Sequence, residues 1–148
     1  RAGMIFQGPG AGIVTAGARK NRPKAVSDQV GADEAQTLAH IVGTLTAASI
    51  AFAADGAKAD ACEAALRQVQ AYAVNAGDGP LMQACAAFAL QIKALQRVRT
   101  DLARAALEAC TQGVCELASL AVDETARRGA VAERVRETVA KAALQRAA

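Results

Sequence analysis

Residues 80–128 decide the fold, and they read PLMQACAAFALQIKALQRVRTDLARAALEACTQGVCELASLAVDETARR. Apolar or small side chains recur there at steps of three and four residues, with one interruption at Arg99. This spacing places them on one face of a helix and predicts a helix-packing stripe. The stripe consists of Leu81, Cys85, Phe88, Ile92, Leu95, Leu102 and Ala106, and it continues through Ala109, Gly113 and Leu120.

The ends of this segment carry ordinary helix signals. Pro80 suits a first helical turn, and Gly129 after two arginines is typical of a helix end. One unbroken helix of this length would extend about 70 Å. A compact domain of this size has a radius of gyration of only about 15 Å. We therefore expect either a break near residues 111–114, around Gly113, or a helix that lies along other chains.

The rest of the chain predicts further helices at roughly 32–54, 57–76 and 130–147. Residues 1–27 contain five of the twelve glycines and two of the three prolines and show no helical period, so they predict an extended arm. The expected fold is all-α. It is an antiparallel bundle of four to five helices, or a long-helix hairpin, in residues 28–148 behind an extended basic N-terminal arm.

The composition favours a chain that packs against others. Hydrophobic residues make up 53% of the 148 residues, but aromatic residues only 3%, and tryptophan is absent. Roughly a quarter of the chain is alanine, far above ordinary usage. Alanine favours helix but removes little area from water, at about 25 cal/mol per Å². This combination suits closely packed helices that have neighbouring subunits.

The positive charge is concentrated at the N-terminus. Residues 1–27 contain five cations and no acid, whereas the remainder is slightly acidic. Such an arm suits an anionic partner, which is nucleic acid, a membrane surface or an acidic protein groove, or it is simply a solvated tail. The candidate partner-binding residues of the arm are Arg1, Arg19, Lys20, Arg22 and Lys24. The glycine-rich run at 8–12 lacks the Lys-Ser/Thr pair of a phosphate-binding loop.

The four cysteines, Cys62, Cys85, Cys110 and Cys115, form no CxxC motif, and the chain has one histidine. Buried reduced thiols are the favoured interpretation. Disulfides are the alternative, for example between Cys110 and Cys115 across a helix break, and a metal site is disfavoured.

Residues 35–54, AQTLAHIVGTLTAASIAFAA, contain no charged side chain. The favoured interpretation is a helix buried on most sides by other helices, with His40 packed in the core. The alternative is a weak membrane-spanning helix, since about 20 residues are long enough to cross a bilayer.

Arg99 stands where the stripe requires an apolar residue. The Arg99 side chain reaches water, or the helix shifts by one position onto Val98. Alternatively, Arg99 is buried and paired with Asp101 or an acid of another chain, which would set the packing register.

Catalysis is not expected. Most carboxylates fall on outward helical faces or at helix ends, with Glu116 as an exception, and no Glu-x-x-His pair occurs. We expect no catalytic, cofactor-binding or metal-binding residues, no cofactor and no small-molecule substrate.

The sequence therefore favours a non-catalytic structural or assembly subunit of a larger protein complex or homo-oligomer, which contacts other protein subunits through the arm and alanine-rich helical faces. One alternative is a virion or nucleic-acid-packaging protein with the arm on phosphates. Another is an accessory subunit of an organelle membrane complex, for example mitochondrial, that spans through residues 35–54.

Overall fold

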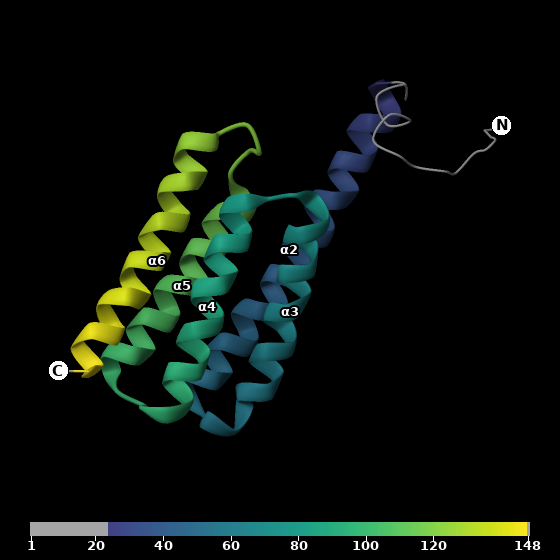
Figure 1. Cartoon of the computed structure of the whole chain (residues 1–148). Coiled ribbons are helices and arrows are strands. Elements are labelled where there is room, and N and C mark those ends of the chain that lie inside the picture. Colours follow the sequence, from purple (N-terminus) through teal and green to yellow (C-terminus); the bar gives the residue numbers. More distant parts are fainter. Residues whose placement is uncertain (1–23, 148) are drawn as a thin grey trace. The chain divides into compact units, whose positions relative to one another are not determined.

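The computed structural model describes the backbone of residues 24–147 and the side chains of residues 33–145. This part of the chain is helical and contains no strand, which confirms an all-α helical bundle (Figure 1). Its elements are α2 (Lys24–Ala54), the short 3-10 helix η1 (Gly56–Lys58), α3 (Ala59–Ala76), α4 (Gly79–Arg97), α5 (Asp101–Ser119) and α6 (Thr125–Ala147).

The residues from Thr37 onward form one compact unit, and the description below concerns that unit. Short connections join α3 to α4, α4 to α5 and α5 to α6, so each helix runs antiparallel to the one before it (Figure 1). Helix α4 packs against α3, α5 and α6, and α5 also packs against α6. Residues 1–23 of the expected arm lie outside the described residues, and α2 begins at Lys24, before the expected boundary at residue 27.

The connection between α3 and α4 follows from three consecutive signals. Gly77 ends α3 in the left-handed conformation, with φ of 66°, which glycine adopts without strain. Asp78 then caps α4, because its Oδ1 accepts a hydrogen bond from the Leu81 N–H at 3.2 Å. Pro80 occupies the first turn of α4, where its missing N–H removes no helical bond.

The long segment 80–128 is divided at a different place from the one we expected. The break lies at residues 98–100, where Val98 is extended and the Thr100 hydroxyl accepts from the Ala103 N–H at 3.1 Å to cap α5. The expected break near residues 111–114 is wrong, because α5 continues through Gly113 to Ser119. A side chain at Gly113 would collide with α6: an added Cβ would lie 2.2 Å from Cγ2 of Val135. This glycine allows α5 and α6 to pack closely.

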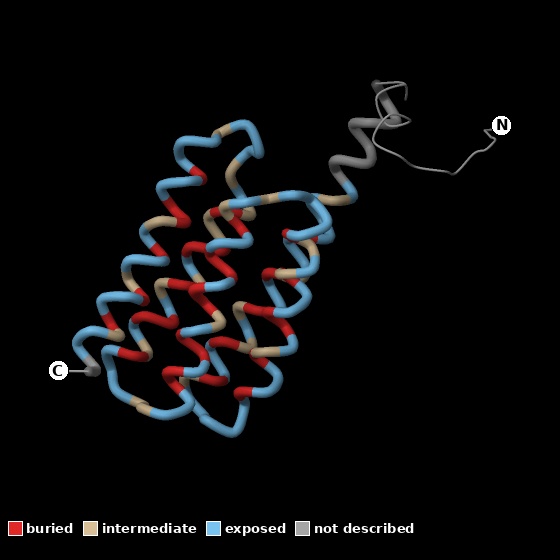
Figure 2. The backbone as a smooth tube through the Cα atoms, viewed as in Figure 1, coloured by how far each residue is buried: buried red, intermediate tan, exposed pale blue. Residues whose placement is uncertain are grey.

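Because the chain breaks at residues 98–100, the apolar positions of α4 and α5 do not lie on one continuous helical face. Leu81, Cys85, Phe88, Ile92 and Leu95 are fully buried along α4, and Ala106 is buried in α5. Leu102, which we expected in the same stripe, is 44% exposed, because α5 starts a new helix at Asp101 with its own phase. Figure 2 shows the buried residues in red along the facing sides of the helices. The buried positions of α5 are Ala103, Ala106, Leu107, Cys110, Gly113, Val114 and Leu117.

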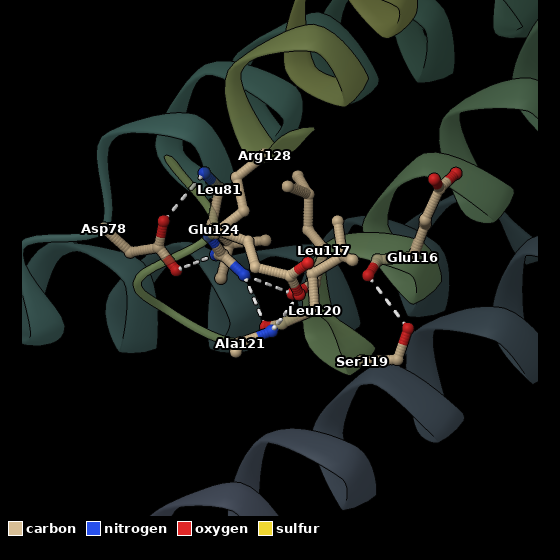
Figure 3. Close-up of polar contacts among 9 residues, drawn as sticks. All are labelled: Asp78, Leu81, Glu116, Leu117, Ser119, Leu120, Ala121, Glu124 and Arg128. Carbon is tan, nitrogen blue, oxygen red and sulfur yellow. Dashed lines mark hydrogen bonds and ion pairs between the residues drawn. The ribbon is translucent and has the colours of Figure 1, made fainter. Parts of the chain in front are cut away.

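A buried ion pair joins three helices at one end of the bundle (Figure 3). Arg128 is 4% exposed, and its Nη2 donates to Oδ2 of Asp78 at 2.5 Å. Its Nη1 donates to the carbonyl oxygens of Leu117 at 2.6 Å and Leu120 at 2.9 Å, at the C-terminus of α5. One guanidinium thus holds the start of α4, the end of α5 and the first turn of α6 together.

The same contact corrects our expectation that residues 127–129 end a helix. Helix α6 already begins at Thr125, and Gly129 lies inside it. Arg128 does interact with the negative end of a helix, but that helix is α5 and not its own. The local pattern was ambiguous because the arginine can reach the carbonyl oxygens of a neighbouring element.

We expect Gly113→Ala to lower the free energy of unfolding by about 1–2 kcal/mol, because overpacking against Val135 outweighs the better helix propensity of alanine. Gly129→Ala is the matched control: an added Cβ there meets nothing within 4 Å, so a gain of about 0.5–1 kcal/mol is expected. Chemical denaturation followed by circular dichroism measures both. Equal stabilisation by the two substitutions would contradict the close packing of α5 on α6.

We expect Arg128→Met to lower the free energy of unfolding by about 3–5 kcal/mol, because it leaves Asp78 and two buried carbonyl groups without their donor. The neighbouring pair provides the control. Arg127 is 66% exposed beside Glu124, and Arg127→Met should change stability by less than about 1 kcal/mol. The same denaturation experiment would refute the role of Arg128 if both variants behaved alike.

Candidate protein-binding face

Residues 37–54 of helix α2 are covered on one side only. The buried positions follow a single stripe, which consists of Leu38, Val42, Leu45, Ser49 and Phe52. Only 28% of the most apolar 18-residue window of α2 is buried. The expectation of burial on most sides is therefore wrong. His40, expected in the core, is exposed, because it lies on the side of α2 away from this stripe.

The C-terminus of α2 is capped by two arginines from the α4–α5 region. Nη2 of Arg99 donates to the carbonyl oxygens of Phe52 at 2.8 Å and Ala53 at 2.9 Å, and Nε of Arg104 also donates to Ala53 at 3.3 Å. The Arg99 guanidinium carbon lies 5.3 Å from the centre of the Phe52 ring, within cation–π distance. These bonds satisfy carbonyl groups that have no partner inside α2.

Two expectations for Arg99 are wrong, namely the helix shift onto Val98 and the pairing with Asp101, whereas pairing with an acid of another chain stays a prediction. Arg99 lies in the connection between α4 and α5, so it interrupts no helical stripe. Asp101, its expected partner, pairs instead with Arg104 at 3.1 Å on the surface. The groups that accept hydrogen bonds from Arg99 are carbonyl oxygens at the end of α2, 46 and 47 residues earlier in the chain. Local spacing cannot reveal a partner at that separation.

Two short polar side chains fix the middle of α2. The Thr46 hydroxyl lies 3.3 Å from the sulfur of Cys115 in α5, and the Ser49 hydroxyl lies 3.5 Å from the sulfur of Cys62 in α3. The single proton of Thr46 goes to the carbonyl oxygen of Val42 at 2.9 Å, so the Cys115 thiol is the donor in their contact. These contacts place one flank of α2 beside α5.

A continuous groove follows this flank between α2 and α5. It consists of two hollows of about 640 Å³ and 590 Å³, which share Thr46, Ile50 and Cys115 as lining residues. Ile50 is 67% exposed on the groove wall. We call this groove, together with the exposed residues Ala39, Gly43, Ala47, Ile50 and Ala51 of α2, the α2–α5 face.

The charge of the α2–α5 face is confined to one end. No residue of α2 from 35 to 54 is charged. The charged lining residues are Asp101, Arg104 and Glu108, all from the first half of α5. The face can therefore bind apolar surface along most of its length, and it offers polar contacts mainly at the α5 N-terminal end.

All four cysteines are free thiols, so the alternative of a Cys110–Cys115 disulfide is not what the structure contains. Burial raises the pKa of Cys85 and Cys110 to about 12, and it also raises the pKa of Cys62. Cys115 is half-buried in the groove. The three buried thiols behave as small apolar side chains of the core.

The side chains described here form no group of three or more histidine, cysteine, aspartate or glutamate residues that could hold a metal ion. Glu116, the carboxylate that the sequence set apart, pairs with Arg134 of α6 at 2.6 Å on the surface. Of the arm residues that we proposed as partner-binding, Arg1, Arg19, Lys20 and Arg22 lie outside the described residues, and Lys24 is described only as the first backbone position of α2.

The sequence directed attention to the stripe of α4 and α5, which is core, and missed the α2–α5 face. The available signal was the absence of charge around the whole circumference of residues 35–54, since a helix covered on one side usually carries charges on the other. No protein-family model matches the chain, and no curated protein sequence and no solved structure matches it significantly.

We expect one thiol to react in the folded protein at about pH 8, and this thiol is Cys115. The raised pKa values keep Cys85 and Cys110 protonated at this pH, and burial also shields Cys62. Alkylation with iodoacetamide followed by peptide mass spectrometry identifies the modified residue. The same reaction in guanidinium chloride is the control, and it should modify all four. Labelling of Cys85 as fast as Cys115 in the folded protein would contradict the core described above.

Proposed function

We propose that this chain is a non-catalytic assembly subunit that binds another protein through the α2–α5 face. The observation that carries the proposal is the open side of residues 35–54 of α2: this segment contains no charged residue, only 28% of its most apolar window is buried, and it borders a groove. Contiguous exposed apolar surface of this kind marks interaction sites in soluble proteins. Grooves between helices are a common place for a partner helix to bind.

Burial of the α2–α5 face by a partner is favoured by the hydrophobic effect. Apolar surface gains about 25 cal/mol for each Å² removed from water. Ile50 is two-thirds exposed and has alanines around it, so a partner that covers the face would bury several side chains at once. The groove supplies hydroxyl groups of Thr46 and Thr111 along its wall; each donates its proton to a carbonyl oxygen of its own helix, so its oxygen can accept hydrogen bonds at the rim of an interface.

Helix α2 is also long and apolar enough to cross a membrane by length and composition, but its contacts favour a protein partner. Its stripe is packed on α3 and α5 through Ser49 and Thr46. Charged residues flank these contacts, such as Glu63 beside Cys62 and Glu116 beside Cys115. A spanning α2 would have to leave the bundle or draw these charges into lipid, at about 2.5–3.5 kcal/mol per charged residue.

The proposal is tested by site-specific photo-crosslinking in the cells that contain the protein. Benzoylphenylalanine replaces Ile50 on the α2–α5 face or Leu90 on α4, which is exposed to a similar extent, 63% against 67%. We expect a discrete protein adduct from position 50 and at most a weak, heterogeneous one from position 90. Mass spectrometry identifies the attached molecule.

A protein adduct of equal yield from both positions would refute a dedicated face. A lipid adduct from position 50, together with resistance of the chain to carbonate extraction, would instead support the membrane alternative. Binding to nucleic acid whose affinity falls steeply with salt, and which leaves position 50 free to react with solvent only, would support the packaging alternative and refute the proposal.

A further inference from the structure

We infer that the partner bound by the α2–α5 face is a second copy of this chain, related by a two-fold axis, with the two α2 helices antiparallel in the shared groove. The inference rests on the proposed function, since it names the occupant of the same face. Three independent observations carry it: the charge pattern of α2, the surroundings of Gly43 and the area that the face can bury.

The charge pattern makes the face complementary to itself. A two-fold interface brings the same patch of both copies together, so a patch with charges of one sign repels its own copy. Residues 35–54 of α2 carry no charge. The other helices of the unit expose charges along their outer sides, for example Arg67 on α3, Lys93 on α4 and Glu137 on α6. Among the side chains that the structure describes, residues 37–54 of α2 thus form a long helical surface that can meet its own copy without repulsion between like charges.

Among the residues that the structure describes, none lies close enough to Gly43 to require a glycine there. A Cβ added at Gly43 would meet nothing within 4 Å, whereas one added at Gly113 would collide with Val135. Glycine destabilises a helix relative to alanine, so a mid-helix glycine without a close neighbour lacks an intramolecular reason. Gly43 continues a run of small exposed residues at every fourth position, Ala39, Gly43, Ala47 and Ala51. Such a run lets the backbone of another helix approach closely.

The available area requires the groove as well as α2. Residues 37–54 form a helix about 27 Å long and 10 Å wide, so α2 against α2 alone covers only about 300 Å² of each copy. A specific interface requires a total of roughly 1,000 Å² or more. The α5 wall of the groove, around Glu108 and Gln112, supplies the remainder when each α2 lies between α2 and α5 of its partner. The resulting four-helix contact is small, and we expect a dissociation constant of about 1–10 µM.

Sedimentation equilibrium of the full chain over a range of about 0.1–100 µM tests this inference. We expect a reversible monomer–dimer equilibrium. Ile50→Glu should weaken it at least tenfold, and Leu90→Glu, the matched control on α4, should leave it unchanged. Gly43→Leu should weaken dimerisation at least tenfold without lowering the melting temperature of the monomer, because no atom of its own fold lies against that position. Equal loss of dimer from Leu90→Glu would overturn the assignment of the face.

Disulfide trapping tests the antiparallel arrangement, in a background where Cys115→Ser removes the half-exposed thiol. Mixing the Ala39→Cys and Ala51→Cys proteins should produce a mixed disulfide dimer in higher yield than either protein alone. Self-linked dimers of each protein in preference to the mixed one would mean parallel helices and would overturn the antiparallel arrangement.

The outcomes separate this inference from the proposed function. A chain that stays monomeric up to the highest concentration, while position 50 crosslinks in cells to a different protein, overturns the inference and leaves the proposed function standing. A monomer whose position 50 yields no protein adduct in cells refutes both. A dimer in solution together with a self-adduct from position 50 supports both.

Discussion

The fold depends on arginines that satisfy the carbonyl ends of helices other than their own. Arg99 closes the end of α2, and Arg128 closes the end of α5 while it pairs with the aspartate that starts α4. The last carbonyl groups of a helix lack internal partners, and leaving them buried and unpaired costs free energy. A core built largely from alanine, leucine and valine contains few other polar anchors, so these two side chains determine where the helix ends meet.

Small residues then set how closely the helices lie. Gly113 has no side chain where Val135 of α6 enters, and alanines such as Ala84, Ala103 and Ala132 are buried between larger neighbours. The large core side chains, Phe52 and Phe88 among them, are few but fully buried. Each alanine removes little area from water, so the stability of such a bundle relies on the number and closeness of its contacts. This explains why α4, which has neighbours on three sides, is the best-buried helix.

The sequence was sufficient for the all-α class, and its spacing identified Leu81, Cys85, Phe88, Ile92 and Leu95 as one face, because helical periodicity is a local property. It failed where the deciding partner was distant. A glycine in the middle of the segment predicts a helix break unless its packing against Val135 is known. In the same way, Arg99 interrupts an apolar pattern for no evident reason unless its hydrogen bonds to the end of α2 are known. The α2–α5 face was missed for a related reason: an uncharged helix predicts burial, but the sequence does not say whether its own chain provides the cover.

The one-sided attachment of α2 has a thermodynamic consequence. Helix α2 contacts the rest of its chain along a single stripe and at one capped end. Such a helix contributes less to the cooperativity of unfolding than a helix surrounded by others. Any companion that covers its open side binds the native form and not the denatured one. Folding and association are then linked by mass action. The population of folded molecules would rise with the concentration of such a companion, so that the supply of the companion would adjust how much of this protein survives in the cell.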